Sequence, residues 1–171
     1  MLDEEMYRRE DGVKYICSPP IREKSNQEKL WEGIQQGYIQ TVATDHCSFN
    51  YKMKKEMGGE DFRKCPNGLP GVETRMPIIF SEGVSKGRIS VNKFVEITST
   101  NPAKLFGMYP KKGTIQVGAD ADLVIIDPNL VKKIRVEDLH ENVDYTPFEE
   151  IEVKGYPVMT ISRGEIIVKD N

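Results

Sequence analysis

A carboxylate, an imidazole and a thiol follow one another directly after an apolar stretch of the chain. Residues 38–44 are apolar and rich in β-formers, and Asp45, His46 and Cys47 come next. Barrel and doubly wound enzymes keep catalytic groups at the carboxyl ends of strands, because the loops there converge on one site. The alternative is an ordinary strand-ending aspartate that caps the amides of the following loop. The pattern leaves both interpretations open.

The two histidines are weaker candidates for metal ligands. Adjacent residues of a strand point to opposite faces, so we do not expect Asp45 and His46 to bind one ion together. We expect His46 to have a structural role or to orient a neighbouring ligand. His140 lies in the polar stretch VEDLHEN, which is typical of a solvated surface histidine.

Ser18 and Asn67 are candidates for contact with a ligand. No G-x-S-x-G elbow surrounds Ser18, so we expect its hydroxyl or backbone either to orient a substrate or to cap a turn. Asn67 and Gly68 resemble a tight turn within PNGLPG, and both turn geometry and ligand contact remain open there. The sequence has neither a Walker loop nor a dinucleotide fingerprint.

The elements that must position these residues alternate between strand and helix. Residues 13–20, VKYICSPP, predict a short strand that stops at its two prolines. The S-x-x-E pattern at 25–28 predicts a capped helix that ends near Gly37. Together with a strand at 38–44 this order is one βαβ unit, and it places Asp45 at the carboxyl end of the second strand.

The second half of the chain changes from helices to strands. The lysine-, glycine- and proline-rich stretch 50–73 lacks clear periodicity, which favours a functional loop. Helices are predicted at 72–84, 91–98 and 101–107. Ser90 is the expected cap of the second of these. A buried strand at 123–126 and a hairpin that turns at Arg163-Gly164 complete the pattern.

Composition narrows the class of protein. Apolar residues make up 38% and charged residues 30% of the 171, as in a globular domain. The net charge of -3, without a basic stripe, leads us to expect no nucleic-acid partner. No apolar run approaches the roughly 20 residues that span a bilayer, so we expect a soluble, cytoplasmic protein with no membrane partner. Three cysteines without CxxC spacing favour reduced thiols.

Six segments, taken together and in order, resemble one family of hydrolases. They are CSPPIREKSNQEKLW, TVATDHCSFN, PNGLPGVETR, SEGVSKGRIS, TSTNPAKLFGMYPKKGTIQVGADADLVIIDP and VKGYPVMTISRG. The chain resembles the C-terminal portion of the dihydropyrimidinase and D-hydantoinase branch of the amidohydrolase superfamily.

This resemblance implies an α/β fold: the C-terminal part of a (β/α)8 TIM-type barrel of a metal-dependent hydrolase, followed by strands of the flanking β-sandwich. Residues 1–110 would then hold the last barrel strands and helices, and residues 111–171 the β-sandwich strands. An intact barrel typically needs about 250 residues, so we expect only a fragment of that fold here.

The resemblance also implies a function for the full-length form, which is hydrolysis of the ring amide of dihydropyrimidines or hydantoins with two divalent metal ions, in this family often zinc. Asp45 matches the aspartate that binds the more exposed metal ion and serves as general base. Ser18 and Asn67 match positions that hold the ring amide of the cyclic diamide substrate, largely through backbone groups. Family members are commonly dimers or tetramers, which implies a homo-oligomer.

The family's remaining metal ligands, an H-x-H pair, a carboxylated lysine and two further histidines, have no match in this chain. We therefore expect no metal to be bound by this segment alone, and no turnover. A non-catalytic dihydropyrimidinase-related scaffold protein and a separate subunit that completes its barrel with a partner chain remain alternatives. Retention of Asp45, Ser18 and Asn67 favours the enzyme.

Overall fold

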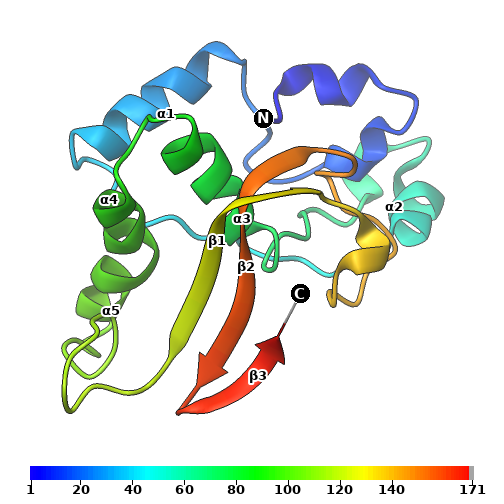
Figure 1. Ribbon diagram of the computed structural model, residues 1–171. Helices are drawn as coiled ribbons and strands as arrows, with labels where there is room; N and C mark the ends of the chain where they lie inside the picture. The colour runs from blue at the N-terminus through cyan, green and yellow to red at the C-terminus, as the bar shows by residue number, and fades with distance from the viewer. Residues whose placement is uncertain (170–171) are drawn as a thin grey trace. The chain divides into compact units, whose positions relative to one another are not determined.

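The computed structural model describes residues 1–169, which fall into two compact units (Figure 1). Unit 1 consists of Met1–Leu30, Thr44–Arg75 and Lys133–Ile151. Unit 2 consists of Trp31–Ala43, Met76–Lys132 and, among the described residues, 152–169. Each unit therefore combines segments that lie far apart in the sequence. The predicted division into barrel elements at 1–110 and β-sandwich strands at 111–171 stays a prediction.

Unit 1 consists mostly of loops and short helices. Helix α2 (Tyr51–Gly58) lies wholly within it, and 3₁₀ turns lie at Glu4–Arg8, Gly12–Tyr15, Phe62–Lys64 and Val136–Asp138. The buried side chains of this unit include Tyr15, Cys65 and Tyr145 and, unusually for a charged residue, Lys54. The prediction that 50–73 has no regular structure was wrong, because α2 occupies its first part.

Helix α1 (Ser25–Gln35) confirms the helix predicted after the first proline pair. The predicted cap was misplaced, since Ser25 is the first helical residue and its hydroxyl donates to Glu23 Oε2 at 3.3 Å. The helix ends near Gly37 as predicted. Gly37 has a φ of +81° and donates its N–H to the carbonyl of Ile34 at 3.2 Å, a geometry that glycine adopts without strain.

The helices that follow residue 75 supply most of the core of unit 2. Helix α3 (Arg75–Ile79) continues into a π-helical turn, and α4 (Val91–Val95) continues through a second π-helical turn into α5 (Asn101–Leu105). The buried apolar cluster consists of Ile34, Phe80, Ile89, Phe94 and Ile97. Burial of such side chains is the main favourable term in folding.

The three predicted helical regions are confirmed, with one change at their junction. Ser90 caps α4 as predicted, since its Oγ accepts the N–H of Lys93 at 3.1 Å. Asn101, predicted as a separate cap, has helical backbone angles, so α5 continues directly from the preceding turn. No helix within residues 1–169 is long and apolar enough to cross a membrane.

Three strands form one sheet in the order β1-β2-β3 (Figure 1). They are β1 (Leu123–Lys133), β2 (Glu152–Ser162) and β3 (Glu165–Lys169). The predicted hairpin is confirmed: β2 and β3 are antiparallel, and Arg163 and Gly164 have φ values of +52° and +85°, as a primed turn requires. Asp170, the last residue of the predicted hairpin segment EIIVKD, lies outside the described residues.

The prediction of a short buried strand at 123–126 was wrong. Strand β1 continues through Pro128 to Lys133, and Val124 and Ile125 are about half exposed. Because β1 is at the edge of the sheet, the missing N–H of Pro128 removes no required ladder bond.

The strands predicted at 13–20 and 38–44 do not form. Residues Gly12–Tyr15 make a 3₁₀ turn, and 38–44 has no regular structure. A strand requires a ladder with a neighbouring strand. Within residues 1–169 this region has only an isolated parallel bridge, between His46 and Leu69.

Candidate active site

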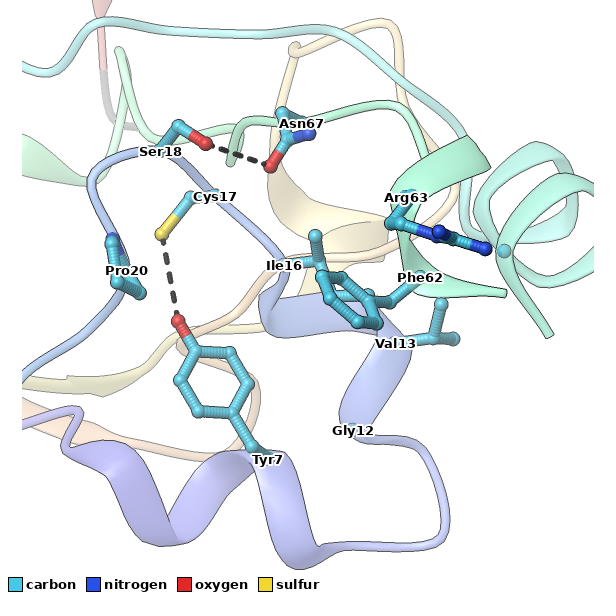
Figure 2. A pocket seen from close by; sticks show the side chains of 11 residues that line it. Tyr7, Gly12, Val13, Ile16, Cys17, Ser18, Pro20, Phe62, Arg63 and Asn67 are labelled. Atoms are coloured by element: carbon cyan, nitrogen blue, oxygen red, sulfur yellow. Dashed lines mark hydrogen bonds between the residues drawn. The ribbon is translucent and has the colours of Figure 1, made fainter. Parts of the chain in front are cut away.

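Ser18 and Asn67, the two predicted substrate-binding residues, are in direct contact although 49 positions separate them. The Ser18 hydroxyl donates to Asn67 Oδ1 at 3.1 Å, and both side chains are exposed (Figure 2). The Asn67 amide nitrogen donates to the carbonyl of Cys65 at 3.4 Å. The first bond joins the two loops at one edge of a cavity, and the second fixes the Asn67 side chain within its own loop.

The cavity has a volume of about 590 Å³ and lies within unit 1. Its wall is mainly apolar, with Ile16, Pro20 and Phe62, and Ser18 and Asn67 supply polar groups. A mainly apolar hollow with a few convergent polar groups is the usual form of a small-molecule site. Figure 2 shows the two polar residues on the same side of this hollow.

Tyr7 adds a phenol to the same cavity. Its oxygen accepts the N–H of Ile21 at 2.7 Å and lies 4.0 Å from Cys17 Sγ (Figure 2). Burial raises the pKa of the Tyr7 phenol, so this group stays protonated at neutral pH. Tyr7 was not among the predicted site residues, because nothing in its local sequence marks it.

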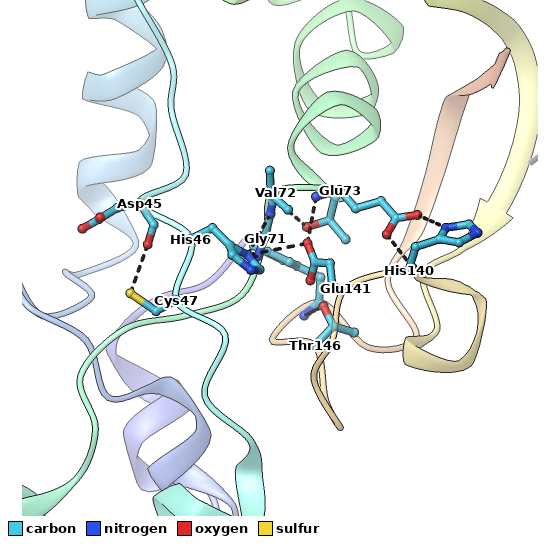
Figure 3. Close-up of polar contacts among 11 residues, drawn as sticks. Asp45, His46, Cys47, Gly71, Val72, Glu73, His140, Glu141 and Thr146 are labelled. Atoms are coloured by element: carbon cyan, nitrogen blue, oxygen red, sulfur yellow. Dashed lines mark hydrogen bonds and ion pairs between the residues drawn. The ribbon is translucent and has the colours of Figure 1, made fainter. Parts of the chain in front are cut away.

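Asp45 has a left-handed backbone with a φ of +47°, which aspartate tolerates better than most residues. Its side chain is exposed, and its own carbonyl accepts a hydrogen bond from Cys47 Sγ at 3.4 Å (Figure 3). Within residues 1–169 the Asp45 carboxylate makes no hydrogen bond or ion pair, so it does not cap the following loop. The carboxylate is free to contact a group from elsewhere, and its role as ligand and base stays a prediction.

His46 fixes the neighbouring loop rather than an ion. Its Nδ1 accepts the backbone N–H groups of Gly71 and Val72 at 3.1 and 3.3 Å (Figure 3). An Nδ1 that accepts these bonds directs its lone pair at the loop rather than at an ion. The structural role expected for His46 is therefore observed.

Glu141 lies behind this imidazole and was not predicted from the sequence. Its side chain is 1% exposed, its Oε1 accepts the N–H of Glu73 at 2.7 Å and lies 3.9 Å from His46 Nδ1. His140, next to it, is 74% exposed as expected, but its Nδ1 also lies 2.9 Å from Glu73 Oε1. These contacts join the segment around residue 140 to the loop that His46 holds (Figure 3).

The two candidate regions are neighbours in unit 1. The N–H of Cys47 donates to the carbonyl of Leu69 at 3.0 Å, which places the segment after Asp45 beside the loop that begins at Asn67. A Cβ added to Gly68 would lie 2.3 Å from Cys47 Sγ, so these backbones are closely packed. The fold therefore connects the segment after Asp45 to the Asn67 loop, and the Asn67 loop to Ser18, by one hydrogen bond each.

The described residues do not complete a metal site by themselves. Within residues 1–169 no three side chains of His, Cys, Asp or Glu lie close enough together to hold an ion. The dinuclear centre implied by the resemblance therefore does not fit these residues alone. The ligand role expected for Asp45 stays a prediction.

Comparison with known proteins identifies the family. The model of the amidohydrolase family matches residues 4–167. The chain belongs to the amidohydrolase family. The resemblance inferred from six short segments is thereby confirmed for nearly the whole chain.

Two similar relatives are both named as hydantoinases. A D-hydantoinase of Geobacillus stearothermophilus is 56% identical over 160 residues, which are 94% of this chain and 34% of that protein. A D-phenylhydantoinase of Escherichia coli is 51% identical over 170 residues, which are 99% of this chain and 37% of that protein. The chain thus spans little more than a third of the length of these relatives.

Solved structures show the same fold over the same fraction. A crystal structure of D-hydantoinase matches with a TM-score of 0.96 and 52% identity, and a dihydropyrimidinase from Brevibacillus agri with 0.97 and 53%. Each match covers 99% of this chain and 37% of the other. The predicted fold class is confirmed: the helices and the three-stranded sheet correspond to part of the amidohydrolase barrel and of the sheet beside it.

Proposed function

We propose that the whole protein containing this segment opens the ring amide of hydantoins or dihydropyrimidines by metal-assisted hydrolysis. The observation that carries the proposal is the hydrogen bond between Ser18 and Asn67 at the edge of the cavity, next to the segment that follows Asp45. The names of the relatives, D-hydantoinase and dihydropyrimidinase, support the same substrate class.

Ser18 and Asn67 would hold the ring mainly through their backbones. The Ser18 hydroxyl and the Asn67 amide oxygen are already hydrogen-bonded to each other. Within residues 1–169 no hydrogen bond engages the backbone N–H or carbonyl of either residue. A cyclic amide presents an N–H donor beside a carbonyl acceptor. A free backbone carbonyl on these loops could accept the ring N–H, and a free backbone N–H could donate to the ring carbonyl.

Asp45 would act as one metal ligand and as the general base toward the attacking water. Its exposed, unengaged carboxylate supports this role. In the complete protein, two divalent ions, which we propose to be zinc, would make hydroxide available at neutral pH. Their other ligands would come from outside this segment. It follows that residues 1–171 alone would bind no metal pair and would not turn over substrate.

We further propose that the complete protein is a cytoplasmic homo-oligomer. Large apolar side chains exposed in unit 2, among them Leu105, Phe106 and Ile115, are available for contact with a second copy or with the rest of the complete protein. Exposed apolar surface of this kind marks contact sites between proteins.

The proposal is tested by ring opening of hydantoin, a 5-substituted hydantoin and dihydrouracil by the complete, zinc-loaded protein. We expect hydrolysis of at least one ring at an enzymatic rate, and none by residues 1–171 under the same conditions. The matched variants are S18A, which removes the contact between the two loops, and N67A, which also removes the hydrogen bond from Asn67 to the Cys65 carbonyl. Failure of the complete, metal-loaded protein to open any of the three rings would refute the proposed function.

A further inference from the structure

Lys54 is fully buried, and it is neither a proposed metal ligand nor a proposed substrate-binding residue. It lies on α2, and its side chain is 0% exposed. Its Nζ donates to the backbone carbonyls of Lys14, Ile16 and Gly68 at 3.2, 2.9 and 2.7 Å. An ammonium group has three hydrogens, so this set of acceptors satisfies it completely.

The three carbonyls flank the two substrate-binding loops. Ile16 precedes Ser18 by two residues, and Gly68 directly follows Asn67. The N–H of Gly68 also donates to the carbonyl of Ile16 at 3.1 Å, so both loops converge on the same ammonium group. We propose that Lys54 is a positioning residue that sets the spacing of the Ser18 and Asn67 loops for a ring amide. This inference rests on the proposed function of that pocket.

The surroundings of Lys54 favour this role over an ion pair. Within residues 1–169 no carboxylate accepts a hydrogen bond from Nζ. The Tyr145 ring lies below the ammonium, with Nζ 5.9 Å from its centroid, and the Tyr145 hydroxyl donates to the Lys14 carbonyl at 3.1 Å. Burial of a charge without a carboxylate is costly, so the carbonyl cage is the compensation that holds the side chain there.

Burial lowers the pKa of Lys54, which is consistent with an ammonium held by neutral partners. Of the three bonds, the one to the Gly68 carbonyl is the hardest to replace if Lys54 is removed. This carbonyl has no other partner within residues 1–169, whereas those of Lys14 and Ile16 each keep a second donor. Loss of the ammonium should therefore release the Asn67 loop first.

The test compares K54M with K55M in the complete protein. Lys55 lies on the same helix but is exposed, so K55M controls for the loss of a charge from α2. Hydrogen–deuterium exchange is measured for peptides that cover residues 14–20 and 65–69, and kinetics are measured for ring opening. We expect faster exchange confined to these peptides in K54M. We also expect KM to rise about 10- to 100-fold with a smaller change in kcat, the range found for residues that orient a site.

A double-mutant cycle separates positioning from a general loss of folding. In the S18A background the effect of K54M on KM should shrink, because both changes act through the same loops. Exchange in K54M at the level of K55M, or an undiminished KM effect in S18A, would overturn the inference. Should K54M prove insoluble, K54Q carries the same test, since its amide keeps part of the cage. If the wild type opens no ring, the proposed function fails, and the exchange data still decide the role of Lys54.

Discussion

Replacement of Gly68 by alanine tests the packing between the Asn67 loop and the segment after Asp45. Gly68 has a φ of +132°, which a side chain rarely adopts. An added Cβ would lie 2.3 Å from Cys47 Sγ and 2.5 Å from Cys47 Cβ. The sulfur can rotate away, but the Cβ is fixed to the backbone, so one of the two segments must move.

Two costs add for G68A. A strained backbone angle costs about 1 to 3 kcal/mol, and overpacking costs about 1 to 3 kcal/mol more. We therefore expect the free energy of unfolding to fall by about 2 to 6 kcal/mol. Because Asn67 is adjacent, the shift should also weaken substrate binding and raise KM.

Chemical denaturation of the complete protein measures this loss, with G87A as the control. Gly87 also has a positive φ, of +69°, but nothing lies within 4 Å of its added Cβ, so G87A should cost only about 1 to 2 kcal/mol. Adding C47G to G68A removes both clashing atoms and should restore the packing part of the loss. Equal destabilisation by G68A and G87A, or no recovery with C47G, would refute the steric reasoning.

Three smaller predictions concern single polar contacts. The hydrogen bond from Arg9 lowers the pKa of Asp11 to about 2. The ionised Asp11 therefore contributes its full stabilisation of the folded state at pH values above its ordinary pKa of 3.8, and this stabilisation is lost as the pH falls toward 2. D11N should thus cost up to about 1 kcal/mol at pH 7, and denaturation at lower pH should show the difference shrinking rather than staying constant. S90A should cost about 1 kcal/mol and S90G only a few tenths, and similar losses for both would argue against the cap. Y145F should cost about 1 kcal/mol in denaturation, because the Lys14 carbonyl loses one of two donors, and a loss several times larger would show that the hydroxyl does more.

Two local signals in the sequence were read correctly, although the caps predicted at Ser25 and Asn101 were not. The turn at Arg163-Gly164 and the cap at Ser90 each depend on backbone angles or one hydrogen bond within four residues. The strands at 13–20 and 38–44 failed for the opposite reason. Apolar alternation gives the tendency to form a strand, but a ladder needs a partner strand, and none pairs with them within residues 1–169.

The candidate site shows the same division between local and distant information. Ser18, Asn67 and Asp45 are proposed through resemblance, because the sequence around each of them is equally consistent with a purely structural role. Lys54 was missed, since α2 contains three lysines and nothing in YKMKKEMG distinguishes the buried one. Its burial is set by carbonyls 14 to 40 positions away, which no local pattern contains.

The central claim is that Asp45 supplies a carboxylate to the chemistry of a cyclic amidohydrolase. The most direct measurement is kcat/KM for hydantoin or dihydrouracil ring opening by the complete protein and its D45N variant, with zinc content determined in both. We predict a loss of about 10²- to 10⁴-fold in D45N, the usual contribution of a general base. Ring opening by D45N at the rate of the wild type, in the folded and metal-loaded protein, would contradict the account.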